Sequence, residues 1–538
     1  MITKKEKAIK LPSALLRFFL YALCGILSGL PVAVPAFWPL GWLAPIPVLF
    51  SEIWMRPKKD RLIFAYGRGF LYFWVFGVTV FFWFTSLYPL DFLGFDKASA
   101  AIVVILACCG IPMLQATVSG LLFVIICIMR RIRAFDRHPF LSAVATALLF
   151  PVFEYFHTLT WAGVPWGKLA VGQTGCLYIV QSVSLFGSYF ITLIIYAFSA
   201  LAALGIKYLI KGDRHRAAIC AVICAAVFLS NLLFGAVYMT ATDTSLENED
   251  KITASAIQGN IRFEDKWGDK EWHTMELYKR LTLEASDNGA QLIVWPETAI
   301  PYDYSFNPRM ERLFKDLSAK TDAEILVTFF ESENGCLYNS ARLLDSKGVI
   351  SEAAYKKRHL VPFGEYTPLE ELINTLVPPL AEMSAIADPL SPGNSTAIME
   401  TQNGRLGTLI CFDSIYEALC LESVRDGAEL IAVSTNDSWF SQSTALGQHN
   451  AHSQLRAIEH RRYVVRSANT GISSIITPTG HITDSLGDGL EGFVTGQVSY
   501  LGGRTLYTSI GNIIVPLCAL LSCAFIIFTL TEKGKAKK

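Results

Sequence analysis

The chain has 538 residues, of which 52% are hydrophobic and 17% charged, and its mean hydropathy is +0.38. This composition is too apolar for an ordinary soluble enzyme of this length and is typical of a membrane protein. The 46 basic residues balance the 46 acidic ones and no long charged run occurs, so nothing in the charge indicates a nucleic acid partner.

Eight long apolar segments account for the high hydropathy. A helix that crosses a membrane needs about 20 mostly apolar residues. The segments of this length are 14–31, 34–53, 62–88, 98–129, 139–160, 177–206, 217–240 and 508–531. Buried helices of a soluble protein are the alternative, but residues 101–129 contain no charged side chain. We therefore expect a multi-pass helical membrane domain with seven spans over residues 1–242, and an eighth span with a basic tail over residues 505–538.

Lysine and arginine occur in alternate loops between these segments. They cluster at residues 4–10, 56–61, 130–137 and 207–216, and the C-terminal tail is also basic. The loop before the fourth segment contains only Lys97, and the loop before the sixth only Lys168. Short cytoplasmic loops of membrane proteins carry an excess of positive charge. Both termini should therefore face the cytoplasm, and the hydrophilic residues 243–504 should lie outside it.

Residues 243–504 are numerous enough for a domain with its own core. Short β-branched runs such as AQLIVWPE and AELIAVSTND alternate with amphipathic stretches, which is typical of an α/β layered fold. No GxGxxG, Walker, HExxH or CxxC motif occurs there, which argues against nucleotide and zinc chemistry. The domain contains Cys336, Cys411 and Cys420, so it has either one disulfide and one free thiol or three free thiols.

Several charged or reactive side chains of this domain follow apolar runs. Glu297 follows LIVWP, Lys357 lies in YKKRHLVPFGEY, and Cys411 follows GTLI and precedes Asp413. Taken alone, each has a structural interpretation: a helix cap, one of a solvated basic trio, or a small core residue. Together with Glu365 they supply what a cysteine nucleophile needs, which is a base, a cation for an oxyanion and a carboxylate that orients the cation.

The order of these motifs resembles the nitrilase superfamily. WPE, KKRHLVPFGE, ICFDS, NDSWF and RAIEHRRYVVRSANTGIS follow one another across nearly the whole outer domain. VPWGKLAVGQ, residues 164–173, resembles a membrane-domain signature of the apolipoprotein N-acyltransferase family, and IQGNIRFEDKW resembles the start of that family's catalytic domain. The resemblance implies an α/β nitrilase-like αββα sandwich over residues 243–504, outside the cytoplasm, joined to a helical membrane domain.

The resemblance also implies a role for each candidate residue. Glu297 would be the general base, and Cys411 the nucleophile that forms a thioester acyl-enzyme. Lys357, helped by the backbone N–H of Phe412, would stabilise the tetrahedral oxyanion, and Glu365 would orient Lys357. No metal or cofactor is needed for this chemistry.

Two positions depart from the family's pattern. Members of the family typically have Tyr and Glu after the nucleophile, whereas Phe412 and Asp413 stand here. The carboxylate is therefore one methylene shorter and a phenol is missing. We expect Asp413 to support the site, because a position two residues past the nucleophile lies close to the thiol whatever the local turn. The alternative is that Asp413 only caps the turn after the strand by bonding nearby backbone N–H groups.

The substrates that the resemblance implies are both lipids. A phospholipid would give its sn-1 acyl chain to the cysteine, and the α-amine of the S-diacylglyceryl cysteine at the N-terminus of an apolipoprotein would accept it. The enzyme would act as a monomer in the bacterial inner membrane, with its catalytic domain on the periplasmic side. Trp166, Gln173 and Trp267 are the candidates for substrate binding.

Other interpretations stay open. Trp267 and the Pro- and Ser-rich segment 366–395 are candidates for a gate, but the tryptophan could be core and the segment a surface loop. A membrane-tethered amidase or nitrilase of a small amide would use the same four residues, with a polar pocket and no need for the spans. A transporter or scaffold that only binds lipoproteins is a third function; the spans lack the paired charges of ion-coupled transport, with Glu154 the main exception.

Overall fold

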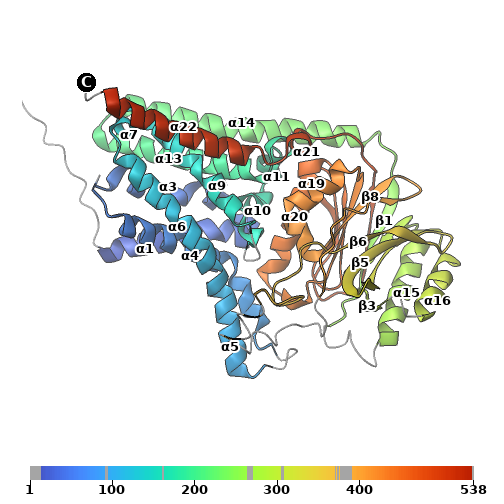
Figure 1. The fold of residues 1–538 in the computed structure, drawn as a ribbon. Helices are drawn as coiled ribbons and strands as arrows, with labels where there is room; N and C mark the ends of the chain where they lie inside the picture. Colours follow the sequence, from blue (N-terminus) through green and yellow to red (C-terminus); the bar gives the residue numbers. More distant parts are fainter. Residues whose placement is uncertain are drawn as a thin grey trace, which may run out of the picture.

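The apolar segments form the helical part of the molecule, on the left of Figure 1. The computed structural model describes residues 14–57, 59–90, 95–159, 163–262, 271–303, 308–369, 371, 375, 390–440 and 442–535. Within these residues six helices are long and apolar enough to cross a membrane: Leu15–Ala33, Leu62–Val80, Lys97–Arg130, Pro139–Phe156, Ser188–Lys211 and Arg214–Leu246. Six of the eight predicted segments therefore contain such a helix.

Short elements join these helices or interrupt them. The α-helices of this part are α1 (Ala14–Ala33), α2 (Pro39–Leu43), α3 (Pro45–Leu49), α4 (Leu62–Val80), α5 (Lys97–Ile105), α6 (Ile111–Arg130), α7 (Arg133–Arg137), α8 (Pro139–Ala147), α9 (Leu149–Phe156), α10 (Leu169–Gly172), α11 (Leu177–Val180), α12 (Val183–Phe186), α13 (Ser188–Lys211) and α14 (Arg214–Leu246). The C-terminal residues add α21 (Leu506–Ile510) and α22 (Ile514–Lys535).

Two of the eight predicted spans do not form a helix of this kind within the described residues. Residues 34–53 contain several prolines, and proline removes an N–H donor and clashes within a helix. This stretch therefore forms a series of short helices, α2 and α3 among them, instead of one span. The apolar stretch of α22 is short, Ile514–Thr529, although the helix packs against α8 and α9 of the helical part. The predicted number of about eight spans is thus approximate.

The remaining chain forms two β-sheets with helices outside them (Figure 1). The first sheet has the order β13-β1-β2-β4-β5-β6, with β3 paired to β4, and the second has the order β12-β11-β10-β9-β8-β7. The strands are β1 (Ile252–Gln258), β2 (Leu292–Val294), β3 (Ile300–Asp303), β4 (Glu324–Glu333), β5 (Cys336–Leu344), β6 (Ile350–Lys356), β7 (Met399–Glu400), β8 (Arg405–Ile410), β9 (Leu430–Thr435), β10 (Val464–Ala468), β11 (Ser473–Ile476), β12 (Ile482–Leu486) and β13 (Gly492–Val498).

Apolar strands at the centre of each sheet explain this layering. Strands β1, β2 and β4 run parallel in the first sheet, and β8, β9 and β10 in the second. Parallel strands covered on both faces consist of nearly continuous apolar runs, and every residue of β2 and β9 is buried. The two sheets contact each other through β1 and β10.

Four helices cover the outer faces of the two sheets. Helices α15 (Glu271–Asp287) and α16 (Pro308–Ser318) cover the first sheet, and α19 (Glu417–Arg425) and α20 (Thr444–His460) cover the second. This arrangement is the predicted αββα sandwich. Figure 1 shows α20 between the sheets and the helical part, and it contacts α1, α10 and α12 there.

A glycine lets α14 approach the backbone of α11. A Cβ on Gly235 would overlap the carbonyl oxygen of Tyr178, and the Asn231 amide donates to the carbonyl oxygen of Ile179 at 2.8 Å. We predict that Gly235→Ala pushes the two helices apart and lowers the free energy of unfolding by about 1–3 kcal/mol. Thermal unfolding of the purified protein in detergent measures this loss.

Gly67→Ala in α4 is the matched control for this substitution. Apart from its own stretch of helix, none of the described residues places an atom within 4 Å of a Cβ at Gly67, and alanine favours a helix over glycine by about 1 kcal/mol. The control should therefore unfold at the wild-type temperature or above it. If Gly235→Ala unfolds at the same temperature as the control, the close approach of α14 and α11 is not what stabilises the helical part.

Candidate active site

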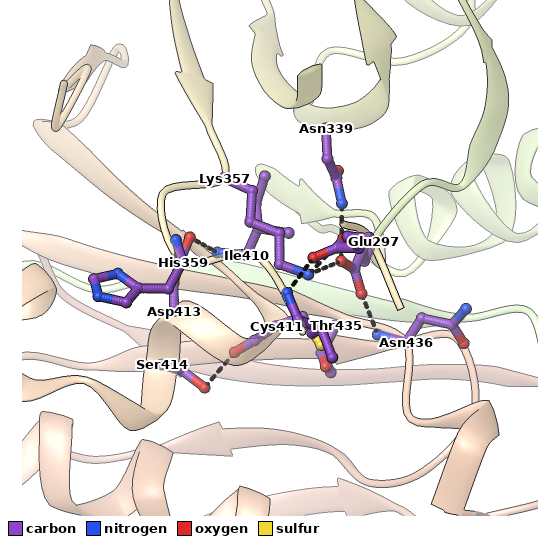
Figure 2. A network of polar contacts seen from close by, with 12 residues as sticks. Glu297, Asn339, Lys357, His359, Ile410, Cys411, Asp413, Ser414, Thr435 and Asn436 are labelled. Atoms are coloured by element: carbon purple, nitrogen blue, oxygen red, sulfur yellow. Dashed lines mark hydrogen bonds and ion pairs between the residues drawn. The ribbon is translucent and has the colours of Figure 1, made fainter. Parts of the chain in front are cut away.

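Polar side chains from both sheets meet where strands end. Glu297 lies shortly after β2, Lys357 directly follows β6, Cys411 directly follows β8, and Asn436 directly follows β9. The carboxyl ends of parallel strands meet at one edge of a sheet, which is where α/β proteins place their sites. Because the two sheets face each other, these side chains converge between them (Figure 2).

Lys357 lies between two carboxylates. Its Nζ donates to Oε1 of Glu297 at 2.8 Å and to Oε1 of Glu365 at 2.9 Å, and all three side chains are buried. Glu297 also accepts hydrogen bonds from Nδ2 of Asn339 at 2.9 Å and from the backbone N–H of Asn436 at 3.1 Å. Both oxygens of Glu297 are thus fixed by donors from the two sheets.

The charges and the burial of this cluster shift the pKa values of Lys357 and Cys411. Burial opposes the charge on Lys357, but the carboxylates of Glu297 and Glu365 outweigh it, so the pKa of the ammonium lies well above its usual value. Burial, and then the charge of Glu297, raise the pKa of the Cys411 thiol. At neutral pH the lysine is therefore charged and the thiol protonated. A base must take the thiol proton during attack, and Glu297 is the carboxylate whose charge acts most strongly on the thiol.

Cys411 has an unusual backbone conformation. It is the first residue of a 3₁₀ helix, Cys411–Ile415, and its φ is +50°. A non-glycine residue in this region is strained by about 1–3 kcal/mol and persists only where its surroundings hold it. Here the Ser414 hydroxyl donates to the Cys411 carbonyl at 2.7 Å. The N–H of Phe412 lies in the first turn, where N–H groups have no partner within the helix, so we expect it to be available to an oxyanion.

Asp413 holds the segment that contains Lys357. Its buried carboxylate accepts hydrogen bonds from the Tyr355 hydroxyl at 2.8 Å, the N–H of His359 at 2.7 Å and the N–H of Arg358 at 3.3 Å. Burial raises the pKa of Asp413 to about 6, and these hydrogen bonds oppose the rise. Asp413 also accepts from the N–H of Ile410 at 3.4 Å, as a cap of the turn would. Since the other two backbone donors directly follow Lys357, we expect Asp413 to act on the site through the position of the lysine.

Phe412 and Trp166 are two further predicted site residues that the structure describes. The Phe412 ring packs edge to face against Tyr416, with ring centroids 5.4 Å apart. Trp166 is buried, its Nε1 donates to Gln448, and its ring centroid lies 5.3 Å from that of His449. Trp166 is thus close to the nucleophile, because His449 contacts the Cys411 turn, but its indole N–H is engaged within the protein.

Gln173 lies within the helical part. Its Oε1 accepts from Nε1 of Trp42 at 2.8 Å, and its Nε2 donates to the carbonyl oxygen of Trp38 at 3.1 Å. The structure does not bring its amide to Cys411, and substrate binding by Gln173 stays a prediction. Trp267 and most of segment 366–395 lie outside the described residues.

Some residues of the site were not singled out from the sequence. Asp437 lay in the NDSWF motif without an assigned role, and Asn339 and His449 lay in none of the motifs. His449 places Nε2 3.2 Å from the Cys411 carbonyl oxygen and Nδ1 2.8 Å from Asp437. Burial opposes the charge of Asp437, but His449 and Arg466 lower its pKa to about 2. The signal that could have identified Asn339 and Asp437 is a polar residue within an apolar strand or shortly after one.

All twelve cysteines are free thiols. Of the two alternatives for Cys336, Cys411 and Cys420, the structure therefore has the one with three free thiols. Among the described residues, no three His, Cys, Asp or Glu side chains group as ligands for a metal ion.

Two family profiles match successive parts of this chain. The family profile described as Carbon-nitrogen hydrolase matches residues 253–502, and the profile described as Apolipoprotein N-acyltransferase N-terminal domain matches residues 24–201. Nit3 from Saccharomyces cerevisiae, a solved member of branch 10 of the nitrilase superfamily, is 17% identical, with a TM-score of 0.37 over 46% of this chain and 90% of its own. The α/β part is a carbon–nitrogen hydrolase domain with a nitrilase-like fold.

Two relatives that bear the name apolipoprotein N-acyltransferase match almost the entire chain. The protein from Geobacter metallireducens is 29% identical over 508 residues, 93% of both chains. The protein from Gloeobacter violaceus is 29% identical over 529 residues, 95% of this chain and 94% of its own. With both family profiles matched in order, this chain belongs to the apolipoprotein N-acyltransferase family.

We predict that Asp413→Ala both destabilises the protein and slows it. Each buried donor that loses its acceptor costs about 1–3 kcal/mol, and the segment with Lys357 loses its support. Asp345→Ala is the control, because Asp345 also accepts backbone N–H groups, from Lys347 and Val349, but in an exposed turn. Thermal unfolding and turnover should both fall for Asp413→Ala, whereas the control should lose only stability. Wild-type turnover in Asp413→Ala would show that Lys357 needs no such support.

Proposed function

We propose that this chain transfers an acyl chain from the sn-1 position of a phospholipid to the N-terminal amine of a diacylglyceryl lipoprotein, by way of a thioester on Cys411. The observation that carries the proposal is a buried ammonium between two carboxylates, next to a cysteine with a strained backbone. The names of the relatives, apolipoprotein N-acyltransferase, support the choice of substrates.

The first half-reaction makes the acyl-enzyme. Glu297 takes the thiol proton while Cys411 Sγ attacks the carbonyl carbon of the ester. The Lys357 ammonium and the N–H of Phe412 stabilise the oxyanion of the tetrahedral intermediate. When the intermediate collapses, the ester C–O bond breaks, and Glu297 returns its proton to the leaving alkoxide. Lysophospholipid departs and the acyl chain remains on sulfur.

The second half-reaction uses the same groups in reverse order. The α-amine of the acceptor attacks the thioester carbon, and Glu297 takes a proton from the nitrogen. The C–S bond then breaks, and Glu297 returns the proton to the Cys411 sulfur. Glu365 contributes by keeping Lys357 oriented through both half-reactions, because the ammonium must meet the same oxyanion position twice. One site thereby serves two substrates in turn.

The helical part gives a reason for the choice of lipid substrates. Both substrates have acyl chains that stay in a bilayer, so the thiol must work near the membrane surface. The helices α19 and α20 next to the nucleophile are on the side of the sandwich that faces the helical part (Figure 1). We place the protein in the bacterial inner membrane as a monomer, with the sandwich on the periplasmic side and both termini in the cytoplasm.

The catalytic assignment predicts the behaviour of two variants. Cys411→Ala should form no N-acyl product, and Glu297→Gln should fold but react about 10²–10⁴ times more slowly. Cys336→Ala, a half-buried thiol in β5, and Glu331→Gln, which pairs with Arg342, are the matched controls and should keep the wild-type rate. Mass spectrometry of a diacylglyceryl lipopeptide acceptor measures the product. Product from Cys411→Ala at the wild-type rate would end the nucleophile assignment.

The alternation of basic loops predicts the orientation of the sandwich. A reporter enzyme that is active only outside the cytoplasm should be active when fused after residue 245 and inactive when fused after residue 135. Both fusions are compared at equal expression. Activity at 135 and none at 245 would reverse the proposed orientation.

A further inference from the structure

The loop of residues 163–169 is attached to the helical part. The backbone N–H of Leu169 donates to Oε1 of Glu154 at 3.0 Å. The side-chain amide of Gln115 in α6 donates to the carbonyl oxygen of Val164 at 2.9 Å. These hydrogen bonds fix both ends of the loop on helices that belong to the membrane domain.

The same loop contacts the sandwich on both sides of the nucleophile. The Tyr416 hydroxyl donates to the carbonyl oxygen of Gly163 at 2.9 Å. The Trp166 Nε1 donates to Gln448, and Nε2 of His452 lies 3.3 Å from the Trp166 carbonyl oxygen. Tyr416 follows the Cys411 turn in the chain, whereas the other two residues belong to α20. The loop therefore joins the two parts of the molecule at the level of the nucleophile.

A buried ion pair stands at the centre of this contact. Lys168 Nζ donates to Oε2 of Glu417, and the two side chains are only 1% and 4% exposed. The same ammonium lies 4.5 Å above the ring of Tyr189, and the second oxygen of Glu417 accepts from the amide of Asn512 at 3.2 Å. Burial opposes the charge on Glu417, but Lys168 and Arg456 lower its pKa to about 2. The Glu417 carboxyl group is therefore ionised at neutral pH.

Glu417 is well placed to influence the thiol. The strained turn Cys411–Ile415 is only five residues long, and strand β8 holds its beginning. Its end is continued by Tyr416 and then by Glu417, the first residue of α19. Both of these residues contact the loop from the helical part. The turn is thus fixed at one end by the sandwich and at the other by the membrane domain.

We propose that Lys168 and Glu417 are positioning residues, whose ion pair docks the nucleophile turn on the helical part and sets the place of the Cys411 thiol. This proposal rests on the proposed function for its acyl-transfer readout. The membrane domain then does more than hold the enzyme near its lipid substrates. Its contact through Lys168 gives the nucleophile turn of the sandwich its reactive geometry.

The energetics of buried ion pairs indicate which variants test this proposal. Removing one partner leaves an unpaired charge in the interior and forces the surroundings to move, whereas replacing both partners by neutral groups of similar volume is often tolerated. Lys168→Met leaves Glu417 unpaired, and Lys168→Met/Glu417→Gln removes both charges. Glu417→Gln alone, which keeps the shape of the side chain, takes the place of Lys168→Met if that variant does not fold.

The experiment uses the full-length protein in detergent and two readouts. The first is the rate at which iodoacetamide alkylates Cys411, followed by mass spectrometry of its peptide, which requires no lipid. The second is the rate of acyl-enzyme formation in a single turnover, with the phospholipid concentration that gives half the maximal rate. Lys279→Met is the control for loss of an ion pair away from the contact, because Lys279 pairs with Asp316 between α15 and α16 on the far face, with side chains 22% and 35% exposed.

Lys168→Met should slow acyl-enzyme formation about 10²-fold, as expected for a reacting group displaced by about 1 Å, and should slow alkylation of Cys411. The half-saturating phospholipid concentration should not change, and the double variant should recover most of both rates. Wild-type rates in Lys168→Met, or a double variant as slow as the single one, would overturn the proposal. If the wild-type protein is alkylated but never acylated, the proposed function fails, and the alkylation rates still decide the role of Lys168.

Discussion

The whole site depends on keeping one ammonium group charged inside the protein. Burial of an isolated ammonium costs several kcal/mol even after relaxation, and Lys357 is 1% exposed. It stays charged because Glu297 and Glu365 flank it, and its backbone stays in place because Asp413 accepts the next two N–H groups. These partners come from both sheets, so only an arrangement that joins the strand ends of two sheets can assemble them. The αββα sandwich meets this condition.

The same charges explain why the nucleophile needs a base close by. The buried thiol remains protonated, so the site stores no thiolate, and in the proposed mechanism Glu297 takes the proton at the moment of attack. The strained φ of Cys411 turns the residue at the end of β8, and hydrogen bonds from its own turn and from α20 hold the carbonyl group in that conformation. With the proposed anchoring of this turn by Lys168, the position of the nucleophile depends on the helical part as well as on the sandwich.

Local patterns in the sequence predicted much of this arrangement, and long-range contacts determined the rest. Hydropathy located six helices that are long and apolar enough to cross a membrane, and strand ends located Glu297, Lys357 and Cys411, because these signals are local. The prolines within 34–53 were equally visible, yet length and hydropathy alone favoured a span there. The acceptor role of Asp413 and the contact of Trp166 with Gln448 join residues 58 and 282 positions apart. No periodicity reports such pairings, so the sequence could not indicate that the Gln173 amide contacts Trp42 and Trp38.

The most direct test of the acyl-enzyme mechanism is to observe the thioester itself. Purified protein is incubated with a phospholipid labelled in its sn-1 chain, and the label is mapped by mass spectrometry. The mechanism predicts one label on the Cys411 peptide that hydroxylamine removes and that a diacylglyceryl lipopeptide discharges as an amide. A lipopeptide that becomes acylated while Cys411 never carries the label would contradict the mechanism.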